Sequence, residues 1–167
     1  MQRWDTRGIT GGSLLTNPSV PVLQSAHAIL MLNGQYILQL RDNKPNIAAP
    51  GQWTLFGGML AKGEKPLQSI QREIFEELCI QPREFKYLWF IDYIAEFEQE
   101  WIRSWFFSAD VKDVWPRYKL MEGQDVGIFP YERTKTMKMP WVMRETIERF
   151  HEMANGLGLK AKGVRKK

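Results

Sequence analysis

The sequence has a single cysteine, Cys79, so it cannot form an internal disulfide framework. Proteins of reducing compartments typically keep such thiols unpaired. The chain also lacks an uninterrupted apolar run long enough to cross a membrane as a helix. Its first 20 residues do not contain the apolar middle of a signal peptide. We therefore expect a soluble, cytoplasmic protein with no membrane partner.

Histidine is almost as scarce, and a general excess of positive charge is absent. His27 and His151 are the only two histidines and lie far apart, which argues against a histidine-based zinc site or a Ser/His triad. No GxxxxGK[ST] loop is present. The net charge is +4, but the segment after Asn155 holds five basic residues and no acid, so the rest of the chain carries −1. We therefore do not expect nucleic acid as a partner of the folded body.

The length of 167 residues and the 44% of apolar residues fit one globular domain with its own core. We divide the chain into a polar N-terminal extension (1–20), a folded domain (21–154) and a basic C-terminal tail (155–167). The tail is interpreted as a solubilising end. The alternative is a weak electrostatic anchor for RNA or acidic lipid.

The first half of the domain reads as strands followed by one helix. Two β-prone runs, Ser25–Leu32 and Gln35–Arg41, flank Asn33-Gly34, which is the strongest short-range hairpin signal. A loop over 42–52 precedes a short strand, Trp53–Phe56, which we expect to end at Gly57-Gly58. A helix then begins near Pro66. Its expected buried stripe consists of Leu67, Ile70, Ile74 and Leu78.

The second half predicts a long hairpin and a closing helix. The expected elements are strands over Phe85–Phe97 and Trp101–Val111 with a turn near Gln99–Glu100, a loop over 112–127, a short strand at Ile128–Phe129, and a helix from Pro140 to about Met153 with Val142, Ile147 and Phe150 in the core. This order predicts a compact mixed α/β (α+β) fold.

The helix after the glycine pair carries an unusual group of acids. Glu73, Glu76 and Glu77 stand at i, i+3 and i+4, which places them on neighbouring positions of one helix face. Like charges at this spacing repel, and a bound divalent cation would relieve the repulsion because such cations prefer carboxylate oxygens. The pattern therefore indicates a metal site, and a metal site suggests a catalytic function. The alternative is a solvated helix face with ordinary ion pairs.

With gaps marked, the segment from Gly58 reads G-x5-E-x7-R-E-I-x-E-E-x-C-I. It resembles the signature of the Nudix hydrolase family, in which U is a bulky aliphatic residue: G-x5-E-x7-R-E-U-x-E-E-x-G-U. The matching residues are Gly58, Glu64, Arg72, Glu73, Ile74, Glu76, Glu77 and Ile80. The only departure is Cys79, where the family has a glycine in a left-handed conformation at the end of the helix. Since no charged group is lost, we expect metal chemistry to survive.

The resemblance implies a Nudix-type α/β/α sandwich with a mixed sheet and a pyrophosphohydrolase that depends on Mg²⁺ or Mn²⁺. It also implies roles for individual residues. Glu73 and Glu77 would be the main metal ligands, with Glu76 beside them. The Gly57 carbonyl would be a backbone ligand, next to Gly58. Glu64 would orient the helix acids, and Arg72 would fix carboxylate rotamers through Glu64 or Glu76.

Two further residues are expected at the site from the same resemblance. Glu122, in the sequence Glu-Gly-Gln, resembles a loop acid of MutT-type enzymes that joins the metal site or serves as base; Asp125 is the alternative. Arg41, at the end of the second strand, resembles an arginine that contacts phosphate; its alternative is a surface charge. The hairpin at 85–111 resembles one that helps form a homodimer in related proteins.

The expected substrate is a nucleotide-type small molecule. We predict a nucleoside diphosphate linked to another moiety, such as a nucleotide sugar or ADP-ribose, because the loop at 42–56 is longer than a minimal nucleotide pocket needs. A MutT-like nucleoside triphosphate pyrophosphohydrolase is the second hypothesis, which the Glu122 loop favours. A non-catalytic nucleotide sensor, an isomerase on the same fold and an RNA-decapping enzyme stay open as well.

Overall fold

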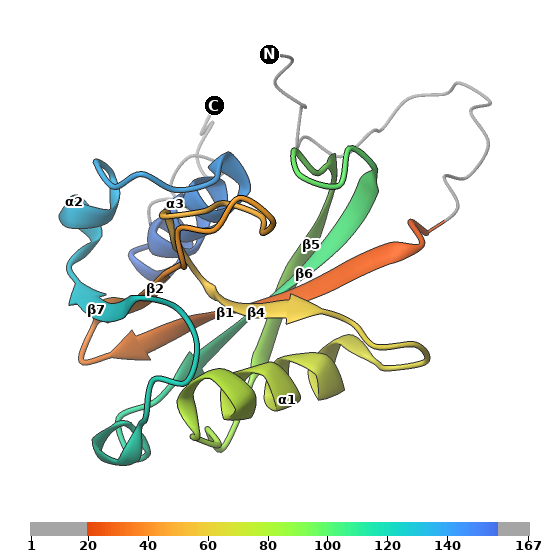
Figure 1. The fold of residues 1–167 in the computed structure, drawn as a ribbon. Helices are drawn as coiled ribbons and strands as arrows, with labels where there is room; N and C mark the ends of the chain where they lie inside the picture. The colour runs from red at the N-terminus through yellow and green to blue at the C-terminus, as the bar shows by residue number, and fades with distance from the viewer. Residues whose placement is uncertain (1–19, 157–167) are drawn as a thin grey trace, which may run out of the picture.

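The computed structural model describes residues 20–156 (Figure 1). The expected extension and the end of the basic tail lie outside the described residues, so the division at 1–20 and 155–167 stays a prediction. The elements in chain order are β1 (Leu23–Leu32), β2 (Gln35–Leu40), β3 (Trp53–Thr54), β4 (Phe56–Met59), α1 (Pro66–Leu78), β5 (Lys86–Ile94), β6 (Trp101–Asp110), a 3₁₀ turn (Trp115–Arg117), β7 (Asp125–Phe129), α2 (Tyr131–Thr134) and α3 (Trp141–Ala154).

The sheet is mixed and is centred on β1. Its main path runs β3-β2-β1-β6-β5, while β4 also pairs with β1 and β7 also pairs with β2. β1 pairs in parallel with β6 over Leu23–Met31, and its pairings with β2 and β4 are antiparallel. These contacts place a strand near the N-terminus beside one about 80 residues later in the sequence. The expected mixed sheet is confirmed.

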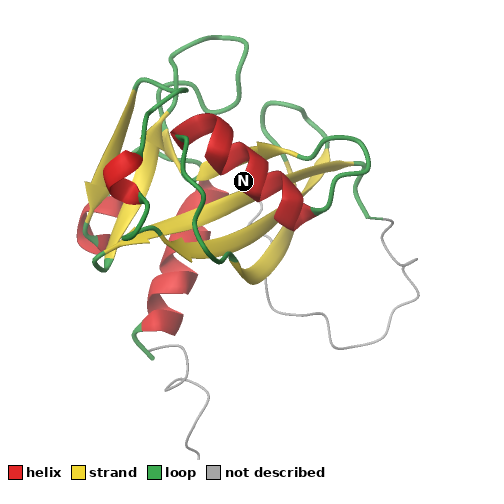
Figure 2. Cartoon of the chain, turned by 90° about the horizontal axis from the view of Figure 1, so that it is seen from below, coloured by secondary structure: helices red, strands yellow, loops and turns green. Residues whose placement is uncertain are grey.

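Helices cover the two faces of this sheet (Figure 2), as the expected sandwich requires. Alternate residues of β1 point to opposite faces. Ala26, Ala28 and Leu30 pack in one buried cluster with the inner side of α1, whereas Ile29 packs in the other with the inner side of α3. Of the residues expected in the α1 stripe, Ile70, Ile74 and Leu78 are fully buried. Leu67 is 43% exposed, so its assignment to the stripe was wrong: it lies in the first turn, before the first buried residue of the helix, Ser69.

The β1–β2 hairpin is confirmed. Asn33 and Gly34 have φ values of +50° and +79°, and two successive left-handed residues are what a two-residue hairpin turn requires. The long second hairpin is confirmed as β5–β6, with the left-handed residue of its turn at Gln99. β7 is longer than expected, because it extends back to Asp125 alongside β2.

One expectation about the glycine pair was wrong. Gly57 and Gly58 do not end a strand; they lie inside β4, which starts at Phe56 and pairs with β1. The expected strand at 53–56 is split, because Trp53 and Thr54 pair with β2 instead. The glycine pair is thus held between β1 and α1. No helix among residues 20–156 is long and apolar enough to cross a membrane.

Candidate functional site

β4 brings its two glycines against neighbouring backbone and side chains. Gly57 has φ +136°, and a Cβ atom there would lie 2.0 Å from the carbonyl oxygen of Ala26. A Cβ atom on Gly58 would lie 2.7 Å from the carboxyl carbon of Glu73. No side chain fits at either position without a shift of its neighbours. The absence of side chains lets α1 bring its carboxylates directly against the backbone of β4.

Glu77 is fixed to β4 by a hydrogen bond. The Gly57 amide donates to Oε2 of Glu77, with 3.0 Å between nitrogen and oxygen. Glu77 is only 2% exposed, so this carboxylate is held out of water at the interface of helix and sheet. Burial and the nearby charge of Glu73 raise the pKa of Glu77 well above its usual range.

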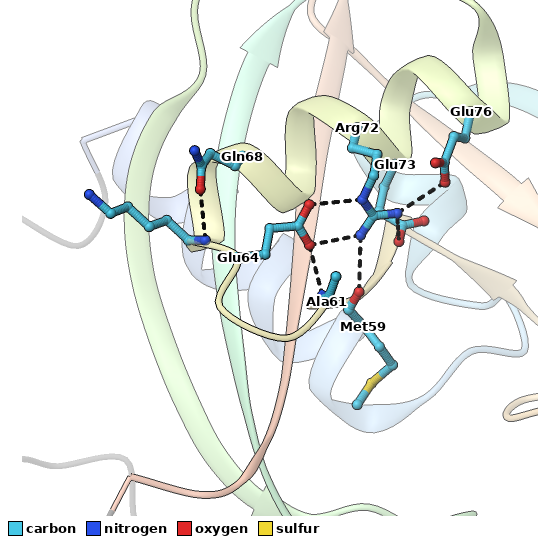
Figure 3. A network of polar contacts seen from close by, with 8 residues as sticks. Met59, Ala61, Glu64, Gln68, Arg72, Glu73 and Glu76 are labelled. Carbon is cyan, nitrogen blue, oxygen red and sulfur yellow. Dashed lines mark hydrogen bonds and ion pairs between the residues drawn. The ribbon is translucent and has the colours of Figure 1, made fainter.

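The two ends of α1 are fixed by local contacts. At its start, Pro66 occupies the first turn and the side chain of Gln68 accepts a hydrogen bond from the Lys65 amide (Figure 3). At its end, Cys79 has φ +55° and its amide donates to the carbonyl of Phe75. Cysteine therefore adopts the left-handed conformation that glycine favours at this position.

Arg72 connects three carboxylates (Figure 3). Its Nε and Nη2 donate to the two oxygens of Glu64 at 2.8 and 2.9 Å, which is a bidentate pair. Its Nη1 donates to Glu73 at 2.8 Å and to Glu76 at 3.0 Å. The expected contacts of Arg72 with Glu64 and Glu76 are thus both present, and Glu73 is added to them.

Glu64 and Glu73 differ in their electrostatics, although both pair with Arg72. Hydrogen bonds from Arg72 and from the Ala61 amide lower the pKa of Glu64 to about 2. Burial raises the pKa of Glu73 above its ordinary value, and the Arg72 contacts oppose the rise only in part. The Arg72 contacts therefore favour the ionised form of Glu64, whereas burial disfavours the ionised form of Glu73.

The loop that carries Glu122 is docked onto the end of α1 and the end of β2. The Met121 amide donates to the carbonyl of Glu77, and the Gln124 amide donates to the carbonyl of Leu40. The Gln39 side chain donates to the Glu122 carbonyl. The charge of Glu122 raises the pKa of both Glu73 and Glu77. Asp125 begins β7 and accepts from the Val126 amide instead.

The donor set suits a hard divalent cation, although the described residues do not form a ready cage. Within residues 20–156, no three His, Cys, Asp or Glu side chains are gathered closely enough to hold a metal ion. One oxygen each of Glu73 and Glu76 faces Arg72. The charge of Glu73 raises the cost of ionising the buried Glu77 carboxylate, and a cation bound by both would relieve that cost. Their chemistry therefore fits Mg²⁺ or Mn²⁺, with Glu76 and Glu122 as neighbours.

A cavity of about 600 Å³ opens on the other side of the glycine pair. Its walls are Gly57 and Gly58 themselves, the loop that includes Pro45 and Pro50, the turn of the β5–β6 hairpin, and the start of α3. Arg41 lines it as well, with its Nε donating to the carbonyl of Ala48. A molecule in this cavity would therefore contact a strand whose far side touches the helix acids.

The sequence interpretation of the site missed several polar residues of this cavity, among them Ser25, His27 and Tyr93. Ser25 and His27 lie on β1, and Tyr93 lies on β5. Burial and the charge of Arg41 lower the pKa of His27 to about 4, so its imidazole is neutral at physiological pH. The sequence signal for the two β1 residues was the polar alternation Ser25-Ala26-His27 just before the apolar run 28–32.

Comparison with known proteins places this geometry in a family. The sequence model of the NUDIX domain matches residues 22–150. The MutT protein from Methanosarcina mazei Go1 superposes with a TM-score of 0.68 at 21% identity, covering 81% of this chain and 96% of its own. The NUDIX domain of Shewanella oneidensis NrtR, complexed with ADP ribose, gives a TM-score of 0.64 at 16% identity and covers 90% and 94%. The E. coli dihydroneopterin triphosphate pyrophosphohydrolase gives 0.63 at 14% identity and covers 76% and 93%.

Proposed function

The chain belongs to the Nudix hydrolase family and is a pyrophosphohydrolase; from that premise we propose that its substrate is a nucleoside diphosphate linked to another moiety, such as a nucleotide sugar or ADP-ribose. One observation carries the proposal. The same two glycines, Gly57 and Gly58, line the cavity and touch the carboxylates of Glu77 and Glu73. If the substrate is bound in the cavity and its pyrophosphate extends out along β4, the pyrophosphate would lie next to the acids of α1.

The size and walls of the cavity favour a substrate with a bulky group on the phosphates. A volume of about 600 Å³ lies in the middle of the range of small-molecule sites. The long loop between β2 and β3 contributes Ile47 and Pro50 to the wall, and the start of α3 contributes Trp141. These apolar groups suit a flat ring. Among the described residues that line the cavity, Arg41 is the only lysine or arginine, and it is the proposed phosphate contact.

We assign the metal to Glu73 and Glu77, with Glu76, Glu122 and the Gly57 carbonyl as further ligands. A divalent cation held there would neutralise phosphate charge and make a bound water more acidic. The chain's own contribution is orientation: Arg72 keeps Glu64, Glu73 and Glu76 within one hydrogen-bonded group. The candidates for the general base are Glu73, Glu76 and Glu122. Of these, Glu73 has a pKa raised by burial.

A MutT-like nucleoside triphosphate pyrophosphohydrolase is the second candidate. The observation that favours it is the Glu122 loop, which docks beside Glu77 through the Met121 amide. The sensor hypothesis draws on the NrtR domain, which was solved with ADP ribose. The complete acid set of α1 supports catalysis over sensing in this chain.

The test is hydrolysis of a panel that contains ADP-ribose, several nucleotide sugars and the nucleoside triphosphates, with Mg²⁺ and separately with Mn²⁺. We expect cleavage of the diphosphate-linked compounds, with a nucleoside monophosphate as one product. A Glu77→Gln variant should lose activity by about 100-fold or more and keep its circular dichroism spectrum. Preferential turnover of triphosphates would select the second candidate, and no turnover of any member would reject both.

The dimer stays a prediction within the same proposal. Tyr87, Phe90, Ile94 and Trp101 of the β5–β6 hairpin are each more than 40% exposed, which makes this hairpin the region to test by analytical ultracentrifugation.

A further inference from the structure

A chain of hydrogen-bonded polar side chains, buried at Ser25 and Ser104 and half-buried at His27 and Tyr93, runs along one wall of the cavity. Ser25 and Ser104 face each other across the β1–β6 pair, with 2.7 Å between their hydroxyl oxygens. The Tyr93 hydroxyl lies 3.0 Å from the Ser104 oxygen, and Nε2 of His27 lies 3.1 Å from the Ser25 oxygen. Three of these four residues line the cavity: Ser25, His27 and Tyr93.

His27 is the last residue of this hydrogen-bonded chain, and only one of its two ring nitrogens has a partner among the described residues. Its Nε2 is engaged by Ser25, and its ring stacks on Phe106 with 5.9 Å between centroids. Its Nδ1 is buried and has no hydrogen-bond partner among the described residues. A buried polar atom without a partner costs folding free energy. His27 lines the cavity, so a ligand there that pairs with Nδ1 after a small rotation of the imidazole would remove that cost.

We propose that His27 determines substrate specificity by hydrogen bonding, through Nδ1, to the edge of a nucleobase or similar neutral heterocycle in the cavity. This rests on the proposed function, because it assigns the bulky end of the same substrate. The neighbouring walls match a flat, uncharged ring: Ile47, Pro50, Phe97 and Trp141 are apolar. Glu96 and Glu98 line the same cavity, so a second phosphate is disfavoured there.

The direction of the hydrogen bonds in the hydroxyl chain is linked to the tautomer of His27, and therefore to whether Nδ1 donates or accepts. Its members are all neutral, and each hydroxyl both donates and accepts. If the protons point from Tyr93 toward His27, Nε2 accepts and Nδ1 carries a proton as a donor. If they point the other way, Nε2 donates and Nδ1 is an acceptor. Nucleobases present both donors and acceptors on their edges, so the bound ring selects the direction.

The experiment measures binding rather than turnover. Isothermal titration with Mg²⁺ present compares AMP, GMP, CMP and UMP with ribose 5-phosphate, none of which contains an anhydride to cleave. We expect at least one nucleotide to bind the wild type more tightly than ribose 5-phosphate. His27→Leu should weaken that nucleotide by about three- to tenfold and leave ribose 5-phosphate unchanged. The matched control is His151→Leu, whose ring contacts Tyr36 and Tyr131 away from the cavity.

The proposal is overturned if no nucleotide is preferred over ribose 5-phosphate, or if His27→Leu weakens both kinds of ligand equally. Thermal unfolding checks that the variant is folded. If it is not, His27→Gln replaces it: the carboxamide offers its donor and acceptor at new positions, so the ranking of the four nucleotides should change, and an unchanged ranking overturns the proposal. If the wild type hydrolyses the substrate panel and His27→Leu binds the nucleotides as tightly as the wild type does, the role of His27 is rejected and the proposed function is kept.

Discussion

The carboxylate of Glu77 on α1 accepts a hydrogen bond from the backbone amide of Gly57 on β4, at 3.0 Å. This contact joins the acidic helix to the strand that lines the cavity. It requires a residue without a side chain on the strand, because β1 lies directly behind it. The site is therefore built as much by two glycines as by the acids.

Substitution of the two glycines should separate stability from activity. Gly57→Ala places a methyl group 2.0 Å from the Ala26 carbonyl, at φ +136°, so it should destabilise the fold by more than about 3 kcal/mol. At Gly58→Ala the three atoms nearest to the new methyl group belong to the Glu73 carboxyl, which can shift by giving up its contact with Arg72, so this variant should retain the fold and lose activity. Denaturant unfolding and a hydrolysis assay measure the two effects.

The control for this pair is Gly63→Ala. Gly63 has φ +77°, and no atom lies within 4 Å of the position that a methyl group would occupy there, so the change should cost only about 1–2 kcal/mol. If Gly57→Ala proves no more costly than Gly63→Ala, the close packing of β4 against β1 is not what the site needs.

We expect metal affinity to depend on the planar guanidinium group of Arg72, which forms several hydrogen bonds at once, and not only on its positive charge. Arg72→Lys keeps one positive charge but cannot bond Glu64 with two parallel N–H groups while also reaching Glu73. We expect metal affinity to fall by about 10- to 100-fold, as measured by Mn²⁺ titration. The matched control is Arg83→Lys, whose side chain is 87% exposed. If both variants bind Mn²⁺ equally well, Arg72 has no role in positioning the metal ligands.

The Glu64 contacts predict a specific pH dependence of stability. Because its pKa falls to about 2 in the folded protein, the ionised form stabilises the fold above the ordinary glutamate pKa of about 4.3. That stabilisation is lost as pH falls from about 4.3 through about 2. Wild type and Glu64→Gln should therefore differ fully at pH 6 and converge in acid, as followed by urea unfolding. Glu132→Gln, on the surface, serves as control; a gap that stays constant with pH would disprove the assignment.

The loop acids should differ in importance. Glu122 raises the pKa of Glu73 and Glu77, whereas Asp125 accepts from the Val126 amide at the start of β7. We expect Glu122→Gln to weaken Mg²⁺ activation of hydrolysis by about tenfold or more, with Asp125→Asn close to wild type. The reverse ranking would assign the downstream acid to Asp125.

Local patterns in the sequence predicted the elements that depend on local chemistry. Asn33-Gly34 specified its own turn, and the 3.6-residue spacing of Ile70, Ile74 and Leu78 specified the buried side of α1. The matches from Gly58 to Ile80 indicated the family, which the NUDIX domain match to residues 22–150 confirms. Leu67 fitted the same spacing and is nevertheless exposed, because it lies in the first turn of the helix, before the residues that pack in the buried cluster.

The remaining features depend on contacts between distant segments. The parallel pairing of β1 with β6 joins residues about 80 positions apart, and no turn residue in the sequence predicts it. The glycine pair looked like the end of a strand, since glycine usually weakens one; it lies within β4 because β1 and α1 leave no room for side chains. The alignment of Ser25, Ser104 and Tyr93 next to His27 likewise follows from strand register alone.

The most direct test of the metal assignment is a Mn²⁺ titration followed by the electron paramagnetic resonance signal of the free ion, on the wild type and on Glu77→Gln. Glutamine keeps an oxygen to accept from Gly57 and removes a buried charge whose pKa is raised, so the metal-free variant should be no less stable at pH 8. The wild type should bind the ion, and the variant should bind it at least about tenfold more weakly. Equal binding by both proteins, or none by the wild type, would contradict the role of this helix as the metal site.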